Sequence, residues 1–237
     1  MLEEASVVVV IPARNEAPRI GAVLAGLPPF VDRVIVVDDG SADGTSDVAS
    51  ARAEGDTRVT ILRNEVSCGV GAAIVRGYEA ALAEPGSPRD AFVVMAGDGQ
   101  MDPRDLLPLV GPIVRGEADY VKGNRFLSED ARAMPIARRV AGEALSIATS
   151  IATGLRVRDS QCGYTAISRA AAASLDLRAL WPRYGYPNDL LAMLAAARMR
   201  VREVVVRPIY RGEPSGVRPR HVLRILWLLA RRAVSRR

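Results

Sequence analysis

The stretch Val7-Val8-Val9-Val10-Ile11-Pro12-Ala13-Arg14-Asn15-Glu16 decides the fold that we expect for this chain. Five β-branched residues stand in a row before Pro12, and polar residues follow within two positions. A short apolar run without alternation is typical of a strand that is buried on both faces of a parallel sheet. We therefore expect a buried strand over residues 7–11, with polar side chains beyond its carboxyl end.

The same pattern recurs along the chain and alternates with helical segments. Further strands are expected over residues 33–37, 59–62 and 91–95, and helices over residues 20–27, 45–53 and 71–82. Ser, Asp and Thr residues, which commonly cap helices, precede the second helix. This alternation predicts an α/β fold, with a right-handed, doubly wound, mostly parallel sheet and helices on both faces. Such sheets bind ligands beyond the carboxyl ends of their strands.

The composition limits the class of protein. The chain has 237 residues, enough for one large domain or two small ones, and its hydrophobic content of 49% is sufficient for a core. Cys68 and Cys162 lie far apart without metal-type spacing, which indicates a reducing setting. We find neither a signal peptide nor an apolar run of the ~20 residues that span a bilayer. We therefore expect a cytoplasmic protein, soluble or peripheral on the inner face of the cell membrane.

Polar and small residues gather where the expected strands end. Asp38-Asp39-Gly40-Ser41 follows the second strand, and a carboxylate there suits ribose hydroxyls or the edge of a base. A tight turn followed by a helix cap explains the same residues equally well. Small residues in Gly69-Val70-Gly71-Ala72-Ala73 open the next helix, where a phosphate is able to approach the backbone.

The fourth expected strand runs into Ala96-Gly97-Asp98-Gly99-Gln100. A carboxylate at the carboxyl end of a central strand is well placed to hold a hard divalent cation and, through it, a diphosphate. Taken alone, Asp98 is better explained as an ordinary turn residue after a strand. Whether Asp98 is a metal ligand is therefore judged from the order of the motifs around it.

In that order, the motifs resemble family 2 glycosyltransferases of the GT-A fold, and within that family the dolichyl- and polyprenyl-phosphate sugar synthases. The resemblance extends from residue 6 to about 210 and is most specific over the first hundred residues. It implies one GT-A domain over residues 1–212, with a nucleotide-sugar-binding half (1–103) and an acceptor half (104–212). Residues 213–237 would form a basic, amphipathic C-terminal helix.

The resemblance also implies a donor site and a metal site. The donor-binding residues would be Pro12, Arg14, Asn15, Glu16, Asp39, Gly71, Asp98 and Gln161. Asp98 and Gln100 match the last Asp and the Gln of the family's Asp-x-Asp-x-Gln pattern, which binds Mg²⁺ or Mn²⁺, while Ala96 replaces its first Asp. A hard cation is still able to use these two residues together with diphosphate oxygens and water. We expect the metal to enter with the sugar nucleotide.

Three arginines are expected on the acceptor side. Lys122-Gly123-Asn124-Arg125-Phe126 matches the family's Gly-(Ser/Asn)-Arg segment, so Arg125 is expected to contact a phosphate and to take part in catalysis. Arg138 and Arg139 follow in a helical stretch, where phosphate-acceptor members also carry a basic residue. Guanidinium groups suit phosphate because they offer paired donors. Two solvated arginines on a helix face are the alternative.

Asp189 is the expected catalytic carboxylate, because residues 186–191 match the family's acidic segment at the start of a helix. With a hydroxyl acceptor it would remove the proton as the new bond forms. With a phosphate acceptor no base is needed, and Asp189 would orient groups instead. As a third interpretation, Asn188 and Asp189 cap a helix over residues 190–197.

The C-terminal end is basic, since a single acidic residue, Glu213, stands among the arginines after Arg207. Residues 219–237 form an amphipathic pattern whose apolar members are Val222, Leu223, Leu226, Trp227, Ala230, Ala233 and Val234, flanked by Arg218, Arg220, Arg224, Arg231, Arg232, Arg236 and Arg237. Such a helix suits the surface of an anionic membrane, the sheet or a second subunit in a homodimer. The Trp and the arginines favour the membrane. The rest of the chain is nearly neutral, which argues against binding to nucleic acid.

We therefore expect an inverting glycosyltransferase of cell-envelope or glycolipid synthesis. It would move a sugar from a UDP- or GDP-sugar to polyprenyl phosphate or another membrane-associated intermediate. Two alternatives stay open: a hydroxyl acceptor on a glycan or natural product, and a nucleotide-sugar-binding protein whose catalysis is impaired by Ala96. Nucleotidyl transfer is disfavoured because residues 12–16 hold no glycine. His221 is the only histidine, which excludes Ser-His-Asp chemistry.

Overall fold

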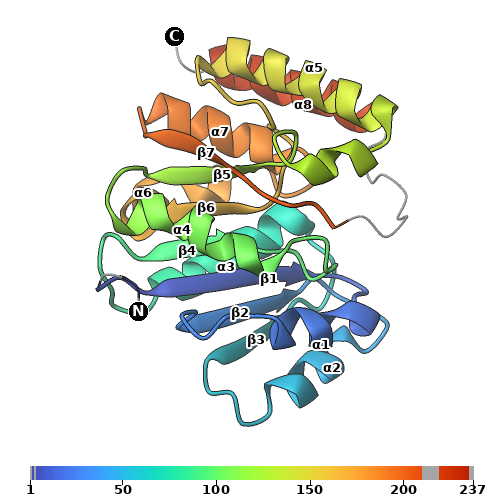
Figure 1. The fold of residues 1–237 in the computed structure, drawn as a ribbon, viewed down its shortest axis with the longest axis vertical. Helices are drawn as coiled ribbons and strands as arrows, with labels where there is room; N and C mark the ends of the chain where they lie inside the picture. Colours follow the sequence, from blue (N-terminus) through green and yellow to red (C-terminus); the bar gives the residue numbers. More distant parts are fainter. Residues whose placement is uncertain (1, 3, 210–218, 235–237) are drawn as a thin grey trace.

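Seven strands form one mixed sheet in the order β3-β2-β1-β4-β6-β5-β7 (Figure 1). This computed structural model describes residues 2, 4–209 and 219–234. The strands are β1 (Val7–Ala13), β2 (Arg33–Asp38), β3 (Val59–Arg63), β4 (Ala91–Val94), β5 (Tyr120–Asn124), β6 (Thr165–Ser168) and β7 (Val201–Val205). Strands β1 to β4 are parallel, β6 is antiparallel to both β4 and β5, and β7 is parallel to β5. The expected mostly parallel α/β sheet is confirmed.

Eight α-helices connect or follow the strands in the described part of the chain. They are α1 (Ala17–Ala25), α2 (Thr45–Ala53), α3 (Val70–Leu82), α4 (Leu106–Val114), α5 (Ile136–Thr153), α6 (Arg169–Ser174), α7 (Tyr186–Ala196) and α8 (Pro219–Val234), with short 3₁₀ turns η1 (Pro103–Asp105), η2 (Glu129–Ala133) and η3 (Leu177–Ala179). Helix α2 has the expected bounds. Helix α1 begins three residues earlier than expected, because Pro18 is favourable in a first turn.

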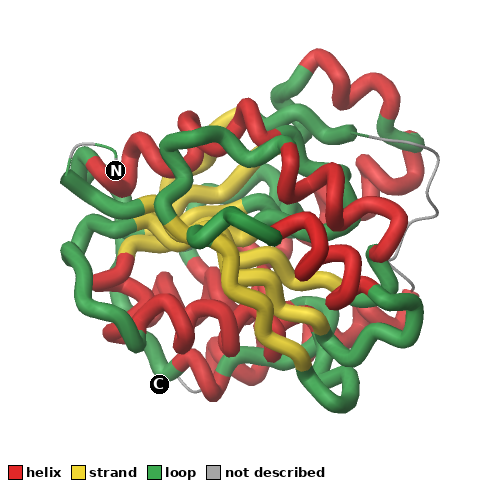
Figure 2. The backbone as a smooth tube through the Cα atoms, turned by 90° about the horizontal axis from the view of Figure 1, so that it is seen from below, coloured by secondary structure: helices red, strands yellow, loops and turns green. Residues whose placement is uncertain are grey.

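The sheet is covered on both faces, as its apolar strands require. Alternate residues of β1 point to opposite sides, so Val7 and Val9 pack with helices α1, α2 and α4, whereas Val8 and Val10 pack with α3, α6 and α7. Figure 2 shows the strands running between helices on either side. The two hydrophobic clusters explain why β1, β2 and β4 consist of uninterrupted apolar runs.

Helices α5 and α8 form a further layer outside α7 (Figure 1). Leu145 of α5 packs against Ile225 and Leu229 of α8 in a small separate cluster. The expected boundary at residue 212 lies outside the described residues, as do Arg218, Arg236 and Arg237, and stays a prediction. Within its described part, the C-terminal helix packs against the domain.

Helix α3 lies directly on β1 through Gly77. A Cβ atom at Gly77 would stand 2.2 Å from Cγ1 of Val10, whereas one at Gly21 of α1 would stand 3.7 Å from its nearest neighbour, Cγ1 of Val48. We predict that Gly77→Ala lowers the free energy of unfolding by about 1–3 kcal/mol through overpacking. Gly21→Ala should raise it by about 0.5–1 kcal/mol, because alanine is the better helix former. Urea denaturation of both variants measures this, and an equal effect at the two positions would contradict the packing described here.

Candidate functional site

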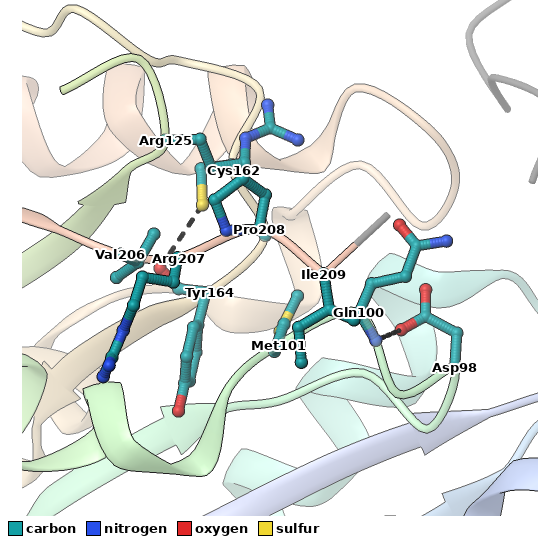
Figure 3. A pocket seen from close by; sticks show the side chains of 11 residues that line it. Asp98, Gln100, Met101, Arg125, Cys162, Tyr164, Val206, Arg207, Pro208 and Ile209 are labelled. Carbon is teal, nitrogen blue, oxygen red and sulfur yellow. Dashed lines mark hydrogen bonds between the residues drawn. The ribbon is translucent and has the colours of Figure 1, made fainter. Parts of the chain in front are cut away.

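A cavity opens where the carboxyl ends of β4, β5 and β7 meet the beginning of β6 (Figure 3). Asp98, Gln100 and Met101 line it from the loop after β4, and Arg125 from the end of β5. Residues 162–164 and 206–209 complete its wall. Residues from both halves of the chain therefore meet at the edge of the sheet where α/β proteins bind ligands.

The loop after β4 holds the expected metal residues in a fixed turn. The backbone N–H of Gln100 donates to Oδ1 of Asp98 at 3.0 Å, and the N–H of Ile209 donates to the Gln100 backbone oxygen at 3.0 Å. Figure 3 shows the Asp98 and Gln100 side chains next to each other at one end of the cavity. Both offer oxygen ligands of the kind that Mg²⁺ and Mn²⁺ prefer. The described residues contain no cluster of three or more His, Cys, Asp or Glu side chains arranged for a metal, so a cation here needs substrate oxygens and water as well.

Glu16 brings a second negative charge towards Asp98. Its carboxylate forms an ion pair with Arg19, with an N–O distance of 2.8 Å. Desolvation raises the pKa of Glu16, and the charge of Asp98 raises it further against the opposing effect of Arg19. Two carboxylates that repel each other are stabilised when a cation binds between or beside them.

Arg125 is held by a buried carboxylate. Its Nε and Nη2 donate to the two oxygens of Asp159 at 2.8 and 3.0 Å, and its backbone N–H donates to the same side chain. Burial alone would raise the pKa of Asp159, but Arg125 and the buried Lys122 hold it below its ordinary value. This pairing fixes the guanidinium group at the wall of the cavity.

Arg138 and Arg139 point to different surroundings. Arg138 is half-buried and lies near Tyr184. Desolvation raises the pKa of Tyr184, so its hydroxyl keeps its proton at neutral pH. The positive charges of Arg138 and Arg125 lower the pKa of the Tyr184 hydroxyl, whereas the negative charge of Asp98 raises it. Arg139 is exposed and forms an ion pair with Glu143 at 3.0 Å. The structure therefore brings Arg138, but not Arg139, towards the other site residues.

The loops after β1 and β2 are tied to each other. The N–H of Asn15 donates to Ser41 Oγ at 2.9 Å, and Oδ1 of Asn15 accepts from the N–H of Ala42 at 3.0 Å. Asn15 has a φ of 56°, a left-handed conformation that asparagine tolerates better than most residues. Pro12 is half-buried at the end of β1, and Arg14 is exposed beside it. Their contact with a nucleoside stays a prediction.

Asp39 organises the loop before α3. Each of its carboxylate oxygens accepts two hydrogen bonds, from the Asn64 side chain, the Ser67 hydroxyl and the backbone N–H groups of Cys68 and Gly69, at 2.7–2.8 Å. Burial would raise the pKa of Asp39, but these four bonds lower it. Because all four acceptor positions are occupied, the predicted nucleoside contact requires Asp39 to give up one of these bonds.

Gly71 permits a close approach between the two halves of the chain. A Cβ atom there would lie 2.3 Å from the backbone oxygen of Trp181, and the N–H of Ala72 donates to the Pro182 oxygen at 3.1 Å. The small residue is therefore explained by the protein's own backbone. Its predicted contact with a phosphate stays a prediction.

Gln161 belongs to a polar network behind the cavity. Its Nε2 donates to Ser160 Oγ and to Oδ1 of Asn188, both at 2.9 Å. Asn188 in turn donates to Thr149 of α5 at 2.7 Å. The amide of Gln161 is thus oriented by α5 and α7, which leaves its role towards a donor sugar as a prediction.

Asp189 is buried inside α7 and bonded to α8. Its Oδ1 accepts from Nε of Arg232 at 2.7 Å, and its Oδ2 accepts from Nη2 of Arg232 and from the Trp181 N–H, each at 2.9 Å. The interpretation of Asn188 and Asp189 as caps is wrong, because α7 already begins at Tyr186, directly after Gly185 with a φ of 104°. Asp189 holds the turn before α7 instead.

Three residues near the site were assigned no role from the sequence, although two of them, Lys122 and Asp159, stand in segments that resemble the family. Asp159 and Lys122 are fully buried, and Lys122 donates to the Cys162 backbone oxygen at 2.6 Å while burial lowers its pKa. Tyr184 lies in the segment between η3 and α7. In the sequence, Lys122 is marked only by its place before Gly123-Asn124-Arg125, and Tyr184 only by its place before Gly185. Neither position has a spacing that is specific to phosphate or sugar binding.

Comparison with known proteins identifies the family. Residues 8–163 match the model of glycosyl transferase family 2, and the chain belongs to this family of glycosyltransferases. The match ends before α7 and α8, so Asp189 lies outside it.

The relatives agree with the expected branch of polyprenyl-phosphate sugar synthases. An undecaprenyl-phosphate mannosyltransferase of Micrococcus luteus is 33% identical over 84% of this chain and 82% of its own length. A UDP-N-acetylglucosamine–dolichyl-phosphate N-acetylglucosaminyltransferase of Methanococcus voltae is 29% identical over 85% of this chain and 84% of its own length. The chain is thus similar to transferases of this branch along most of its length.

A solved structure confirms the GT-A fold. Glucosyl-3-phosphoglycerate synthase of Mycobacterium tuberculosis, crystallised with Mn²⁺, UDP and glucosyl-3-phosphoglycerate, superposes with a TM-score of 0.71 and 24% identity. The alignment covers 97% of this chain and 80% of that protein. At this identity the likeness establishes the fold.

The buried ion pair between Asp159 and Arg125 should stabilise the fold in a pH-dependent way. Because the folded pKa of Asp159 lies below 3.8, its stabilisation is complete above that pH and is lost as the pH falls through the folded value. We predict that Asp159→Asn lowers the free energy of unfolding by about 3 kcal/mol at pH 7. The difference from wild type should shrink below pH 3.8 in urea denaturation. A difference that stays constant under acid would show that the carboxylate charge is not its source.

Proposed function

We propose that this glycosyltransferase moves a sugar, with inversion, from a UDP- or GDP-sugar to polyprenyl phosphate. The observation that carries the proposal is the convergence of Asp98, Gln100 and Arg125 on one cavity at the strand ends of a family 2 fold. The acceptors named for the relatives from Micrococcus luteus and Methanococcus voltae, undecaprenyl and dolichyl phosphate, support the choice of acceptor. A hydroxyl acceptor is the remaining alternative.

The donor would lie along the loops after β1, β2 and β4. Asn15, Glu16 and Asp39 would face the nucleoside, and Asp98 with Gln100 would hold Mg²⁺ or Mn²⁺ together with diphosphate oxygens. The bound metal would neutralise charge on the departing diphosphate. Crystals of the related fold with Mn²⁺ or Mg²⁺ and UDP support the pairing of a divalent cation with a nucleoside diphosphate.

The reaction would be a direct displacement at the anomeric carbon. An oxygen of the acceptor phosphate forms the new bond to that carbon while the bond to the diphosphate oxygen breaks, and the nucleoside diphosphate leaves with the electron pair. Arg125, held by Asp159, would orient one of the phosphates, and Arg138 would attract the acceptor. The Tyr184 hydroxyl, which keeps its proton, would donate a hydrogen bond to a phosphate oxygen.

The state of Asp189 favours a phosphate acceptor. A hydroxyl acceptor needs a base near the nucleophile, but Asp189 is engaged within the protein: its Oδ1 accepts from Arg232, and its Oδ2 accepts from Arg232 and from the Trp181 N–H. A phosphate acceptor is already anionic and needs no base. Asp189 would then act by holding the segment that carries Tyr184.

Binding at the inner membrane surface is part of the proposal, because polyprenyl phosphate is a lipid. Among the described helices, none is long and apolar enough to cross a bilayer. We propose that the chain meets its acceptor at the cytoplasmic surface.

The proposed reaction is tested by incubating the protein with a panel of UDP- and GDP-sugars, Mn²⁺ and polyprenyl phosphate, followed by mass spectrometry of the lipid. We expect a mass increase of one sugar from one donor. A sugar found on a hydroxyl acceptor but never on the lipid phosphate would support the alternative, and binding of the donors without turnover would support an impaired enzyme.

Asp98 is predicted to be required for metal-assisted donor binding. Asp98→Ala should lower the transfer rate by about 100-fold or more, because an electrostatic contact to the leaving diphosphate is lost. It should also abolish the increase in nucleotide affinity that Mn²⁺ causes, measured by calorimetry. Asp47→Ala, an exposed carboxylate on α2, is the matched control and should behave as wild type. Equal Mn²⁺ dependence in the two variants would refute the metal role.

Arg138 and Arg139 form a matched pair for the acceptor. Arg138→Ala should lower kcat/KM for polyprenyl phosphate about 10- to 100-fold, because a charge-assisted hydrogen bond to phosphate is lost. Arg139→Ala removes an exposed ion pair with Glu143 and should change it by no more than about twofold. Steady-state kinetics against acceptor concentration measures both. Similar losses of kcat/KM in the two variants would contradict a specific contact of Arg138 with the acceptor and would indicate that the total positive charge of α5 matters instead.

A further inference from the structure

A groove separate from the candidate site lies between α3 and the segment that precedes α7. Its walls come from the loop before α3, from α3 itself and from residues 177–182, and its volume is about 480 Å³. The residues that line it are all different from those that line the cavity at Asp98. Binding sites for small organic molecules commonly have volumes in this range.

Contacts at two points join the walls of this groove. The N–H of Ala72 donates to the backbone oxygen of Pro182 at 3.1 Å, where Gly71 permits the close approach. Two turns further along α3, Glu79 accepts from Nε of Arg178 at 3.0 Å. The two contacts are roughly 10 Å apart along the helix axis, which leaves room between them for a ring and a phosphate group.

The lining of the groove combines apolar side chains with an excess of positive charge. Two arginines, Arg76 and Arg178, line it together with one acidic residue, Glu79. Glu79 is paired with Arg178, whereas Arg76 has no carboxylate partner among the described residues. The apolar members are Ala72, Val75, Leu177, Leu180 and Pro182. Such a lining suits an anion that carries an apolar body.

Arg76 offers a phosphate the same pair of donors with which Arg125 binds Asp159. Its Nη1 donates to Oδ1 of Asn64, whereas Nε and Nη2 have no partner in the part of the chain that the structure describes. The Nε–H and one Nη2–H group lie side by side on one edge of the guanidinium plane, so together they are able to bind two phosphate oxygens. A bidentate contact of this kind is among the strong hydrogen bonds of proteins.

We propose that this groove binds a phosphate-bearing small molecule whose apolar body packs between α3 and residues 177–182. The phosphate binds Nε and Nη2 of Arg76, and the apolar body contacts Val75, Leu177 and Leu180. An inorganic anion would lack these apolar contacts, and a neutral molecule would leave the donors of Arg76 without a partner.

The groove is connected to Asp39 through one side chain. Arg76 only donates hydrogen bonds, so Asn64 must turn its amide oxygen to Arg76 and its NH₂ group to Asp39, at 2.8 Å. A phosphate on Arg76 would hold this arrangement in place. Since the predicted nucleoside contact requires Asp39 to give up a hydrogen bond, an occupied groove would oppose nucleotide binding. This consequence rests on the proposed function, whereas binding in the groove does not.

Calorimetry with phenyl phosphate, without nucleotide or acceptor, tests the site. Wild-type protein should bind phenyl phosphate at least about tenfold more tightly than inorganic phosphate, which lacks the apolar body. Arg76→Gln should weaken the binding of phenyl phosphate about tenfold or more, because the charge-assisted pair of hydrogen bonds is lost. The matched control is Arg52→Gln, an exposed arginine of α2, which should bind as wild type.

Two further measurements localise the ligand. Ala72→Phe fills the groove and keeps both arginines, so it should also abolish binding. Phenyl phosphate should slow the alkylation of Cys68 by iodoacetamide in wild-type protein, because the exposed Cys68 thiol stands at the wall of the groove. Cys162 is buried, so its alkylation would report unfolding. An unchanged thermal unfolding temperature shows that each variant is folded.

The coupling to Asp39 is measured with the same probe. Saturating phenyl phosphate should weaken the binding of UDP or GDP about fivefold or more, and the nucleotide should weaken the binding of phenyl phosphate by the same factor. Asn64→Ala should still bind phenyl phosphate but lose this coupling. An unchanged nucleotide affinity in wild-type protein would refute the coupling and leave the groove site intact.

Three results would overturn the proposed site. One is wild-type protein that does not bind phenyl phosphate, and another is binding that Arg76→Gln leaves unchanged. The third is binding that survives Ala72→Phe and leaves the alkylation of Cys68 unchanged, since the ligand would then lie elsewhere. Binding in the groove by a protein that transfers no sugar would refute the proposed function and leave the site intact, whereas sugar transfer without binding in the groove would do the reverse.

Discussion

The hydrogen bonds of the Asp189 carboxylate are the constraint on which the shape of the site depends. They join the Trp181 backbone to Arg232 of α8, and so fix the turn that carries Tyr184. The same turn lies against the backbone at Gly71, beyond the loop that Asp39 organises. A continuous set of contacts therefore runs from the loop before α3, through the turn before α7, to the C-terminal helix.

This connection gives the C-terminal helix α8 a structural role in the domain. From the sequence, the basic helix was expected to follow the catalytic domain as a separate C-terminal segment. In the structure, α8 also packs on the turn before α7, since Ile225 and Leu228 lie where a Cβ atom at Gly185 would contact them. Removing α8 would expose this packing and leave the buried Asp189 without its cation. Helix α8 therefore supports the turn that carries Tyr184.

The sequence predicted what depends on local pattern. The four expected strands became the parallel strands β1 to β4. The apolar runs of β1, β2 and β4 are buried because the sheet is covered on both faces, whereas the edge strand β3, which includes Thr60, is only partly buried. Asp98 and Arg125 reached one cavity because both follow strands that end at the same edge. The antiparallel strand β6 was not predicted, since Thr165-Ala166-Ile167-Ser168 is too short to show its direction. The pairing of Asp189 with Arg232 and of Arg125 with Asp159 depends on contacts 34 or more residues apart, which no local pattern reveals.

The central claim is that a nucleoside diphosphate and a divalent cation meet at Asp98 in the cavity between the two halves. A crystal structure with Mn²⁺ and the nucleoside diphosphate that most raises the unfolding temperature tests it most directly. The account predicts Mn²⁺ bound to Asp98 and to the diphosphate oxygens, with the base against the loops after β1 and β2. A nucleotide bound outside this cavity, or Mn²⁺ bound without Asp98, would contradict it.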